Sequence, residues 1–237
     1  MSEPGVPAEG TNASRAVRVV TYNVRSLRDD RQALGRVVRE LRPDVLCLQE
    51  APRMLGWRHR LAALARDTRM LYVAGGGTTG GVAILSSLAV DVLDTRELIL
   101  SRTRGLHRRG AVTAEVRLGA TTFAVAAVHL GLDAAERRRH AGQIAAALRE
   151  REPGPSVVAG DLNEVAGHAA YNILAAGRTD CAGTDPTPTF STRAPRRRID
   201  AVLASPALTV HHYRVGSGAD VERASDHRPV VVDLLGD

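Results

Sequence analysis

The sequence predicts an α/β fold: a four-layer α/β/β/α sandwich in which two packed mixed sheets are flanked by helices. Two observations point to it. Short runs rich in Val, Leu and Ile alternate with amphipathic stretches along most of the 237 residues, and the expected strands outnumber the expected helices. Strands that pair both with near neighbours and with distant segments are typical of two packed sheets, whose outer faces are then covered by helices.

The first half of the chain alternates strands with helices. The run over 30–43 has apolar side chains at Leu34, Val37, Val38 and Leu41, which is the spacing of one helical face. Further on, a glycine-rich turn, "GGGTTGG", separates the first two of three runs that we interpret as a meander. Strands are expected at residues 16–24, 44–50, 69–75, 82–87 and 88–94, and helices at 30–43 and 57–67.

The second half contains a predicted hairpin, a long helix and further strands. A Gly-Ala pair between two β-rich runs favours the hairpin. Glu136, three residues after Asp133, gives the pattern of a capping box, so the helix is expected to begin at Asp133 and to end near Glu150, before "EPGP". Strands are expected at 110–118, 121–130, 156–161, 198–205, 208–215 and 228–235, and a short helix near 167–176.

Length and composition favour a single domain over 16–237, preceded by a disordered leader over 1–15. No apolar run is long enough to span a bilayer, and the N-terminal stretch lacks the apolar core of a signal peptide. A cytoplasmic protein without a membrane anchor is therefore expected. Cys47 and Cys181 are expected to be free thiols, because two cysteines form no framework and no Cys/His spacing indicates a zinc site.

The formal net charge of +6 favours anionic partners. The sequence has only one Trp, four Tyr and two Phe, which argues against a stacking platform for single-stranded nucleic acid. Two groups of arginines precede strands, and each is either a solvated loop or a contact for a nucleic-acid backbone. They stand at 102, 104, 108 and 109, and at 193 and 196–198.

Polar side chains capable of binding a metal or a phosphate recur where the expected strands end, the part of a fold where loops present chemistry. Carboxylate and amide oxygens are hard ligands suited to Mg²⁺ or Mn²⁺, and histidines beside an unpaired acid supply acid/base groups. Hydrolysis of a phosphoester needs both kinds of group. The residues are Asn23, Glu50, His129, Asp161, Asn163, Asp200, Asp226 and His227.

Each of these residues also has an ordinary structural interpretation. Asn23 is able to cap a turn, "GDLN" is able to form an Asx-turn, and His129 is able to lie hydrogen-bonded at the core edge. Glu50 is able to act as a first-turn acid, and Asp200 to pair with the arginines before it. In "SDHRPV", Asp226 and His227 are neighbours in extended chain and point to opposite faces, so each needs a different partner.

The motifs "TYNV", "LQE", "GVAILSS", "RRGAV", "VHL", "GDLN", "RRRID" and "SDHRPV" occur in this order. From about residue 16 to 235 the sequence thereby resembles the endonuclease/exonuclease/phosphatase superfamily, the DNase I-like proteins. The resemblance implies the four-layer sandwich, with a site at one edge of the two sheets. It implies that Asn23, Glu50 and Asp226 hold the principal Mg²⁺, with Mn²⁺ as the other candidate ion.

The resemblance also implies the catalytic roles. Asp161 and Asn163 would position the attacking water or a second ion. His227 would contact the phosphate and act as, or beside, the general base, oriented by Asp200. His129 would bind a phosphate oxygen and assist the leaving group. Abasic-site endonucleases of the family place a tyrosine near the position of "VHL", so His129 resembles the DNase I, sphingomyelinase and phosphatase branches instead.

The expected function is a Mg²⁺-dependent phosphoesterase that hydrolyses phosphodiester bonds, and the basic charge favours a nuclease. The alternative is a phosphatase or phosphodiesterase for a small-molecule or lipid head-group phosphoester. A catalytically silent binding protein is disfavoured because all eight polar positions are present, and a Ser-His-Asp hydrolase because there is no "GxSxG" elbow. The expected partner is nucleic acid or another phosphoester substrate, and no obligate protein partner is inferred.

Overall fold

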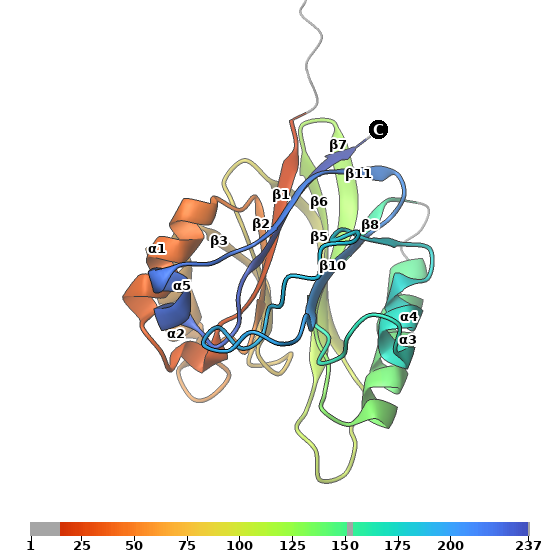
Figure 1. Ribbon diagram of the computed structural model, residues 1–237, viewed down its shortest axis with the longest axis horizontal. Helices are drawn as coiled ribbons and strands as arrows, with labels where there is room; N and C mark the ends of the chain where they lie inside the picture. Colours follow the sequence, from red (N-terminus) through yellow and green to blue (C-terminus); the bar gives the residue numbers. More distant parts are fainter. Residues whose placement is uncertain (1–14, 151–153, 237) are drawn as a thin grey trace, which may run out of the picture.

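The computed structural model describes residues 15–150 and 154–236. Two six-stranded sheets pack face to face in this part of the chain, with α1, α2 and α5 outside one sheet and α3 and α4 outside the other (Figure 1). This arrangement confirms the four-layer α/β/β/α sandwich. The expected leader falls almost entirely on residues 1–14, outside the described residues.

The first sheet has the strand order β11-β12-β1-β2-β4-β3. Its β1 and β2 are parallel and the other neighbours are antiparallel, so the sheet is mixed as predicted. The strands are β1 (Val17–Asn23), β2 (Val45–Gln49), β3 (Leu71–Gly76), β4 (Val82–Ser86), β11 (Leu208–Val215) and β12 (Val230–Gly236).

The second sheet has the order β5-β6-β7-β8-β10-β9. Here β7 and β8 form the parallel pair, and the other neighbours are antiparallel. The strands are β5 (Asp91–Ile99), β6 (Gly110–Leu118), β7 (Thr121–His129), β8 (Ser156–Asp161), β9 (Thr179–Asp180) and β10 (Asp200–Ala204).

The helices follow the capping signals of the sequence. Asp30 accepts hydrogen bonds from the backbone N–H groups of Gln32 and Ala33 at the start of α1, and Asp133 accepts one from Glu136 at the start of α3. The helices are α1 (Arg31–Leu41), α2 (Trp57–Thr68), α3 (Ala134–Arg149), α4 (Ala169–Ala175) and α5 (Ala219–Ala224), with a short 3-10 turn over Arg25–Leu27.

The core lies between the two sheets, where alternate strand side chains such as Val19, Val125 and Val232 are fully buried. Separate apolar layers lie under the helices on each outer face. Cys47 and Cys181 are buried free thiols, as expected, and burial raises the pKa of each to about 12. Neither thiol is therefore ionised at neutral pH.

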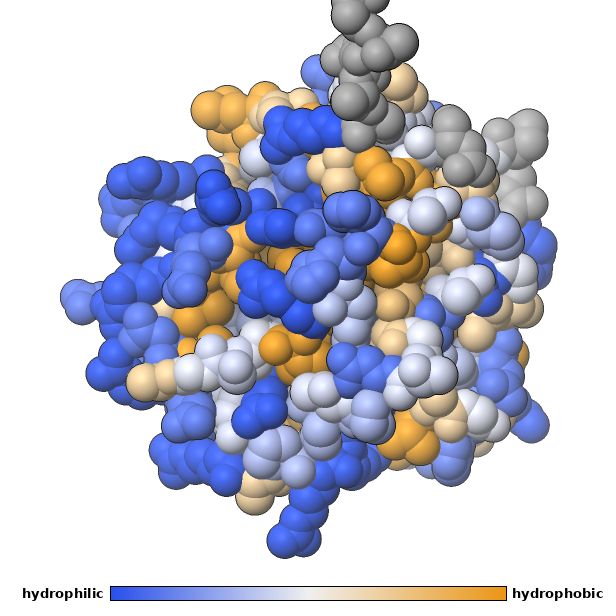
Figure 2. Space-filling view, turned by 45° about the horizontal axis from the view of Figure 1, so that its top comes forward, coloured by the Kyte–Doolittle hydropathy of each residue, from blue (hydrophilic) through white to orange (hydrophobic). Residues whose placement is uncertain are grey.

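Hydrophilic side chains cover most of the side that carries α1 and α5, with smaller apolar areas nearer the middle of the view (Figure 2). Within the described residues, none of the helices has the length and apolar character required to cross a membrane.

Two local predictions were wrong, and two short elements were missed. The expected meander does not form, because β3 and β4 lie in the first sheet whereas β5 pairs with β6 in the second. Strand β5 spans Asp91–Ile99 and not the predicted 88–94. Nearly all its side chains are exposed, so no apolar alternation in the sequence marks its ends. Short elements α5 and β9 were not anticipated, because six and two residues carry too little periodicity.

The topology brings six strand termini to one edge of the sandwich. The parallel pairs place the carboxyl ends of β1 and β2, and of β7 and β8, at that edge. The antiparallel β10 starts there, with Asp200 opposite Asp161, and β12 starts there beside the end of β1. This edge is the one at which the sequence analysis placed the functional residues.

Candidate active site

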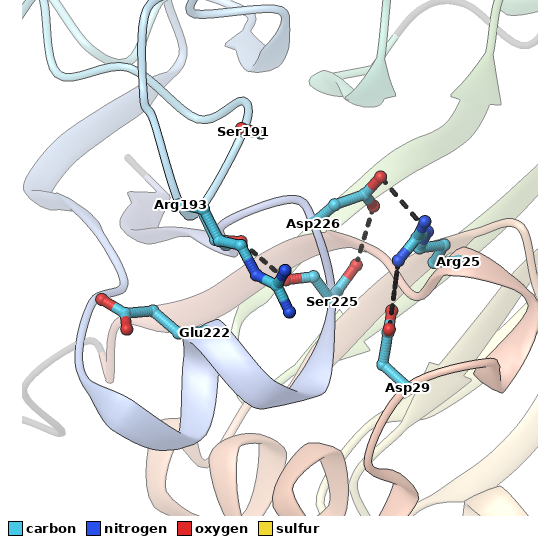
Figure 3. A pocket seen from close by; sticks show the side chains of 8 residues that line it. Arg25, Asp29, Ser191, Arg193, Glu222, Ser225 and Asp226 are labelled. Carbon is cyan, nitrogen blue, oxygen red and sulfur yellow. Dashed lines mark hydrogen bonds and ion pairs between the residues drawn. The ribbon is translucent and has the colours of Figure 1, made fainter.

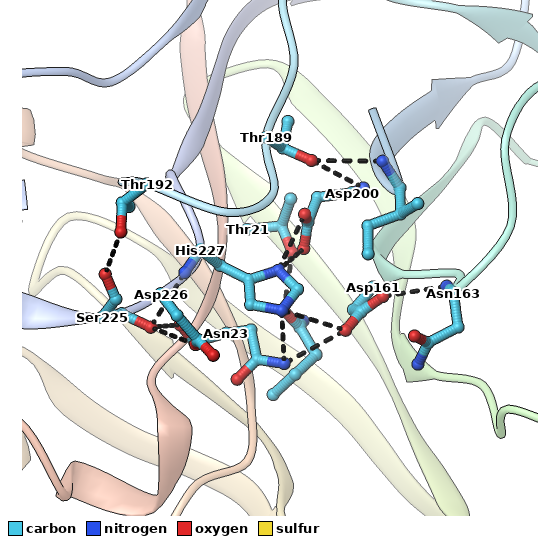
Figure 4. A network of polar contacts seen from close by, with 12 residues as sticks. Thr21, Asn23, Asp161, Asn163, Thr189, Thr192, Asp200, Ser225, Asp226 and His227 are labelled. Carbon is cyan, nitrogen blue, oxygen red and sulfur yellow. Dashed lines mark hydrogen bonds and ion pairs between the residues drawn. The ribbon is translucent and has the colours of Figure 1, made fainter. Parts of the chain in front are cut away.

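The pair of His227 and Asp200 lies buried at the junction of the two sheets (Figure 4). His227 Nδ1 is 2.9 Å from Asp200 Oδ2 and 3.1 Å from Oδ1. Thr189 Oγ1 accepts hydrogen bonds from the backbone N–H groups of Ile199 and Asp200, and the Phe190 ring lies 4.7 Å from the imidazole, centroid to centroid. These contacts fix the ring orientation and leave Nε2 facing the site.

Asp161 is the centre of the cluster. Its Oδ2 accepts a hydrogen bond of 3.1 Å from Asn23 Nδ2 and lies 3.4 Å from His129 Nε2 and 3.7 Å from His227 Nε2. Its Oδ1 accepts a hydrogen bond from the backbone N–H of Asn163, which is the Asx-turn considered in the sequence analysis. The turn and the site therefore use the same carboxylate.

Asn23 and Glu50 meet because β1 and β2 are parallel neighbours whose ends coincide. Asn23 Nδ2 is 3.3 Å from Glu50 Oε1, while Asn23 Oδ1 accepts from the backbone N–H of Arg25 and so also caps a turn. Glu50 is not a first-turn helix acid: its φ of 50° ends the strand with a sharp turn. That turn aims a half-buried carboxylate back at the site.

Asp226 lies at the margin of the site (Figure 3). Its Oδ2 is 3.3 Å from Arg25 Nε, and it lines a cavity of about 180 Å³ together with Arg193 and Ser191. The adjacent Ser225 donates to the backbone oxygen of Asn23 and accepts from the His227 N–H, which ties "SDH" to the end of β1. As expected, Asp226 and His227 have different partners.

His129 is buried beside Asn163. Asn163 Nδ2 is 3.3 Å from His129 Nε2 and donates to the backbone oxygen of Leu130. Burial lowers the pKa of His129 to about 4, despite the nearby Asp161 carboxylate. The imidazole is therefore neutral at neutral pH.

The electrostatics of the centre are those of crowded carboxylates. Burial raises the pKa of Asp161, and the charge of Asp200 raises it further. Burial alone would lower the pKa of His227, but the charges of Asp200, Asp161 and Asp226 and the hydrogen bond to Asp200 raise it to about 9. Two acids and an imidazolium thus share a small buried volume.

The structure shows which groups pair with Asp200 and with the arginines that precede it. Asp200 does not pair with the arginines that precede it, because His227 occupies its carboxylate. Arg198 instead forms an ion pair of 2.5 Å with Asp180, which also accepts from the Tyr171 hydroxyl. Arg198 is therefore withdrawn from the second arginine group.

The sequence analysis did not assign a site role to Arg109. This residue directly precedes β6 and is half-buried. Burial lowers its pKa, while the neighbouring carboxylates of Asp161, Glu136 and Glu50 oppose that change. Its signal in the sequence is "RRGAV", which was counted among the family motifs and within an arginine group but without a role for Arg109.

The donor chemistry of the cluster fits a hard divalent cation. One ligand atom each from Asp161, Asp200 and His227 lies within 4.8 Å of the others. The buried carboxylates repel one another, and the amide of Asn23 and the carboxylate of Glu50 stand next to them. Oxygen ligands with surplus negative charge are what Mg²⁺ or Mn²⁺ binds.

A four-layer sandwich with a buried acid and histidine cluster at one sheet edge has the DNase I-like fold of phosphoester hydrolases. The chain belongs to the Endonuclease/Exonuclease/phosphatase family, whose model matches residues 20–227. No curated protein sequence matches the chain significantly.

Solved structures of low sequence identity share the whole fold. An endonuclease/exonuclease/phosphatase from Bacteroides vulgatus is 20% identical with a TM-score of 0.78, covering 94% of this chain and 99% of its own. A mannosyl-6-phosphatase from Bacteroides thetaiotaomicron is 18% identical with a TM-score of 0.78, covering 92% and 99%. A humanized TDP2 from D. rerio is 19% identical with a TM-score of 0.72, covering 92% and 98%.

Proposed function

We propose that the protein is a Mg²⁺-dependent phosphoesterase that hydrolyses phosphodiester bonds, with nucleic acid as its substrate. The observation that carries the proposal is the buried cluster of Asp161, Asp200 and His227. Its carboxylates crowd one another, and its imidazole is oriented and charged by an acid, which is the arrangement expected at a functional site. The family assignment supports the same reaction class.

Asn23, Glu50 and Asp226 would hold the metal ion, with Asp161 and Asn163 beside it, and Asp226 would have to turn from Arg25 Nε, which lies 3.3 Å from its Oδ2. When bound, Mg²⁺ would neutralise the charge that develops on the non-bridging oxygens of the phosphoryl group. The amide of Asn23 would have to present its oxygen, which at present accepts from the Arg25 N–H. Rotation of the side-chain amide would present that oxygen and would break the hydrogen bonds from Nδ2 to Asp161 and Glu50 and the one from the Arg25 N–H.

His227 and Asp200 would handle the proton. With a pKa of about 9, His227 offers Nε2–H to a phosphate oxygen at neutral pH. A cation beside Asp161 would offset part of the carboxylate charge and lower that pKa, so that Nε2 is able to accept a proton from the attacking water. Asp200 keeps Nδ1 protonated in either state.

His129 and Asn163 would serve the other side of the phosphoryl group. Because burial keeps His129 neutral, it acts as a hydrogen-bonding group and not as a fixed positive charge. Its neighbour Asn163 holds Nε2 in place at 3.3 Å. In the hydrolysis, water adds to phosphorus and the bond to the leaving oxygen breaks, and this side of the site would hydrogen-bond that oxygen while its proton comes from solvent.

The arginines around the edge favour nucleic acid over a small substrate. Six of them are exposed and form no ion pair with a carboxylate among the described residues, so their charge is free for phosphates. A polyanion contacts several such charges at once. They are Arg102, Arg104, Arg108, Arg193, Arg196 and Arg197.

A small-molecule phosphoester is the second candidate. The cavity of about 180 Å³ beside Asp226 has room for one small polar group and is lined by Arg25 and Arg193. A mannosyl-6-phosphatase has the same fold. This candidate needs only one or two of the exposed arginines.

A salt series separates the two candidates. We expect kcat/KM on duplex DNA to fall steeply with salt, and the double variant Arg196→Ala with Arg197→Ala to flatten the slope by about one unit for each phosphate that no longer has an arginine partner. A chromogenic phosphodiester should show a shallow slope in both proteins. The matched control is Arg198→Ala, whose guanidinium is already paired with Asp180 and should leave the slope unchanged. Equal shallow slopes on both substrates would favour the small-molecule candidate.

A further inference from the structure

Glu136 is a buried carboxylate with one oxygen that meets no donor among the described residues. The capping-box pattern predicts that its side chain returns to the N-terminus of α3, but only the Asp133 half of that box forms. Glu136 is instead 2% exposed, and its Oε1 is buried with no hydrogen-bond partner among the described residues. An unpaired buried carboxylate is costly, so a cation or donor is expected to meet it.

The carboxylate points toward the site. A Cβ placed on Gly131 would lie 2.1 Å from Glu136 Oε2, so this oxygen lies against the backbone two residues after His129. Ala111 of β6 pairs with Val128 of β7, and Arg109 precedes β6 at the same end of the sheet at which Leu130 and Gly131 follow β7. Glu136 and Arg109 therefore approach the same end of β7 from different elements.

Neighbouring Arg137 is not the partner of Glu136. Its Nη1 donates to the backbone oxygens of Gly131 and Leu132, and its Nη2 lies 3.6 Å from Glu164 Oε1. Arg109, in contrast, forms no ion pair within the described ranges 15–150 and 154–236, although it experiences the charge of Glu136. Arg109 and Glu136 are therefore not an ion pair within 4 Å, but they lie near enough for the charge of Glu136 to act on Arg109.

We propose that Glu136 is a positioning residue that holds the Arg109 guanidinium beside Asp161, where its remaining N–H groups bind a phosphate oxygen of the substrate. A guanidinium has five donors in a rigid fork, so one edge is able to engage Glu136 while the other faces the phosphate. Without such an anchor, Arg109 would be drawn onto Asp161 or Glu50, whose charges also act on it. This inference rests on the proposed function, because the phosphate belongs to the substrate of that site.

The test compares phosphate affinity across variants, using inorganic phosphate as the probe. Affinity is measured as competitive inhibition of phosphodiester hydrolysis and, independently of activity, by phosphorus NMR titration. We expect Arg109→Ala to weaken it by about 10- to 100-fold, the loss of charge-assisted hydrogen bonds. We expect Glu136→Gln to weaken it by about 3- to 30-fold and to raise KM more than it lowers kcat.

A double variant tests whether the losses in phosphate affinity are additive, which distinguishes action through Arg109 from a purely structural role of Glu136. If Glu136 acts through Arg109, adding Glu136→Gln to Arg109→Ala should cause no further loss. Glu150→Gln, at the exposed end of the same helix, is the matched control and should keep phosphate affinity within about twofold, as expected for a surface pair. Should Glu136→Gln fail to fold in a thermal scan, Glu136→Asp, which withdraws the carboxylate by one methylene, must give the same loss.

The outcomes separate this inference from the proposed function. Unchanged phosphate affinity in Glu136→Gln, or additive losses in the double variant, would overturn the role of Glu136. A parent protein that hydrolyses phosphodiesters while Arg109→Ala keeps full phosphate affinity would leave the function standing and remove the inference. If the parent protein has no hydrolytic activity but phosphate affinity falls in both single variants, the proposed function would be overturned and the role of Glu136 would stand.

Discussion

Asp200 sets the state of His227 at the scale of single residues. Both of its oxygens lie within hydrogen-bond distance of Nδ1, and its charge is the main influence that raises the imidazole pKa against burial. The remaining nitrogen, Nε2, faces Asp161 and Asn23. In the proposed mechanism, Asp200 therefore orients the imidazole, and His227 transfers the proton.

Removing the Asp200 charge should separate these roles. We expect Asp200→Asn to lower kcat by about 10²- to 10⁴-fold, because an amide neither charges the imidazole nor fixes its tautomer. Thermal unfolding and metal binding should persist, and His227→Ala should cost at least as much. Asp91→Asn, which removes an exposed carboxylate paired with Arg117, serves as the control and should retain kcat. Additive losses in the double variant of Asp200 and His227 would count against a single functional unit.

At the scale of elements, the site depends on how β1 and β12 are joined. These strands bring together residues from the two ends of the described chain, and Arg18 pairs with Asp233 across them at 2.7 and 2.8 Å. The hydrogen bond from Arg18 lowers the Asp233 pKa against a smaller opposing effect of burial. Since the pairing also fixes the start of β12, it helps to place "SDH" beside Asn23.

Loss of this ion pair should make stability depend less on pH. We expect Asp233→Asn to reduce the free energy of unfolding at pH 7 by about 1–3 kcal/mol, the range for a charged hydrogen bond. Because the folded-state pKa is depressed, the contribution of Asp233 is present above its unfolded value of about 3.9 and is lost as pH falls through the folded value. Denaturant unfolding of both proteins at neutral and acid pH measures this. A stability difference that stays constant down to acid pH would contradict the assignment.

At the scale of the whole molecule, the sandwich makes one site from two sheets. Asn23 and Glu50 come from the first sheet, and Asp161 and Asp200 from the second. The acids therefore converge only when both sheets pack, and their repulsion is imposed by the fold. A cation bound at this junction would link the two halves.

Metal binding should consequently affect both activity and stability. Chelation is expected to abolish hydrolysis, and Mg²⁺ or Mn²⁺ to restore it. The metal at 100 times its dissociation constant should add about 2.7 kcal/mol to the free energy of unfolding, since the unfolded chain lacks the assembled site. Glu50→Gln should weaken this stabilisation, measured by thermal scans across a metal titration. Full activity in excess EDTA would contradict the metal hypothesis.

Much of the fold and the site follows from local patterns. Apolar periodicity predicted β1, β2, β7, β8 and α1 near their observed bounds, because neighbouring side chains alone determine which face of an element is apolar. The eight polar residues at strand ends were likewise recognisable one by one. The ordered motifs indicated the family, and the family match confirms it.

Pairing over long distances was decided only by the tertiary structure. Nothing local showed that Asp200 binds His227 and not the arginines before it, that Asp180 withdraws Arg198, or that β5 leaves the meander for the second sheet. The inward turn of Glu136 also contradicts its capping-box pattern. The sequence by itself determined the periodicity of each element and the chemistry at each strand end. Which of these groups meet depends on sheet order and burial, because the partners are brought together by the packing energy of the whole core and not by their own neighbours.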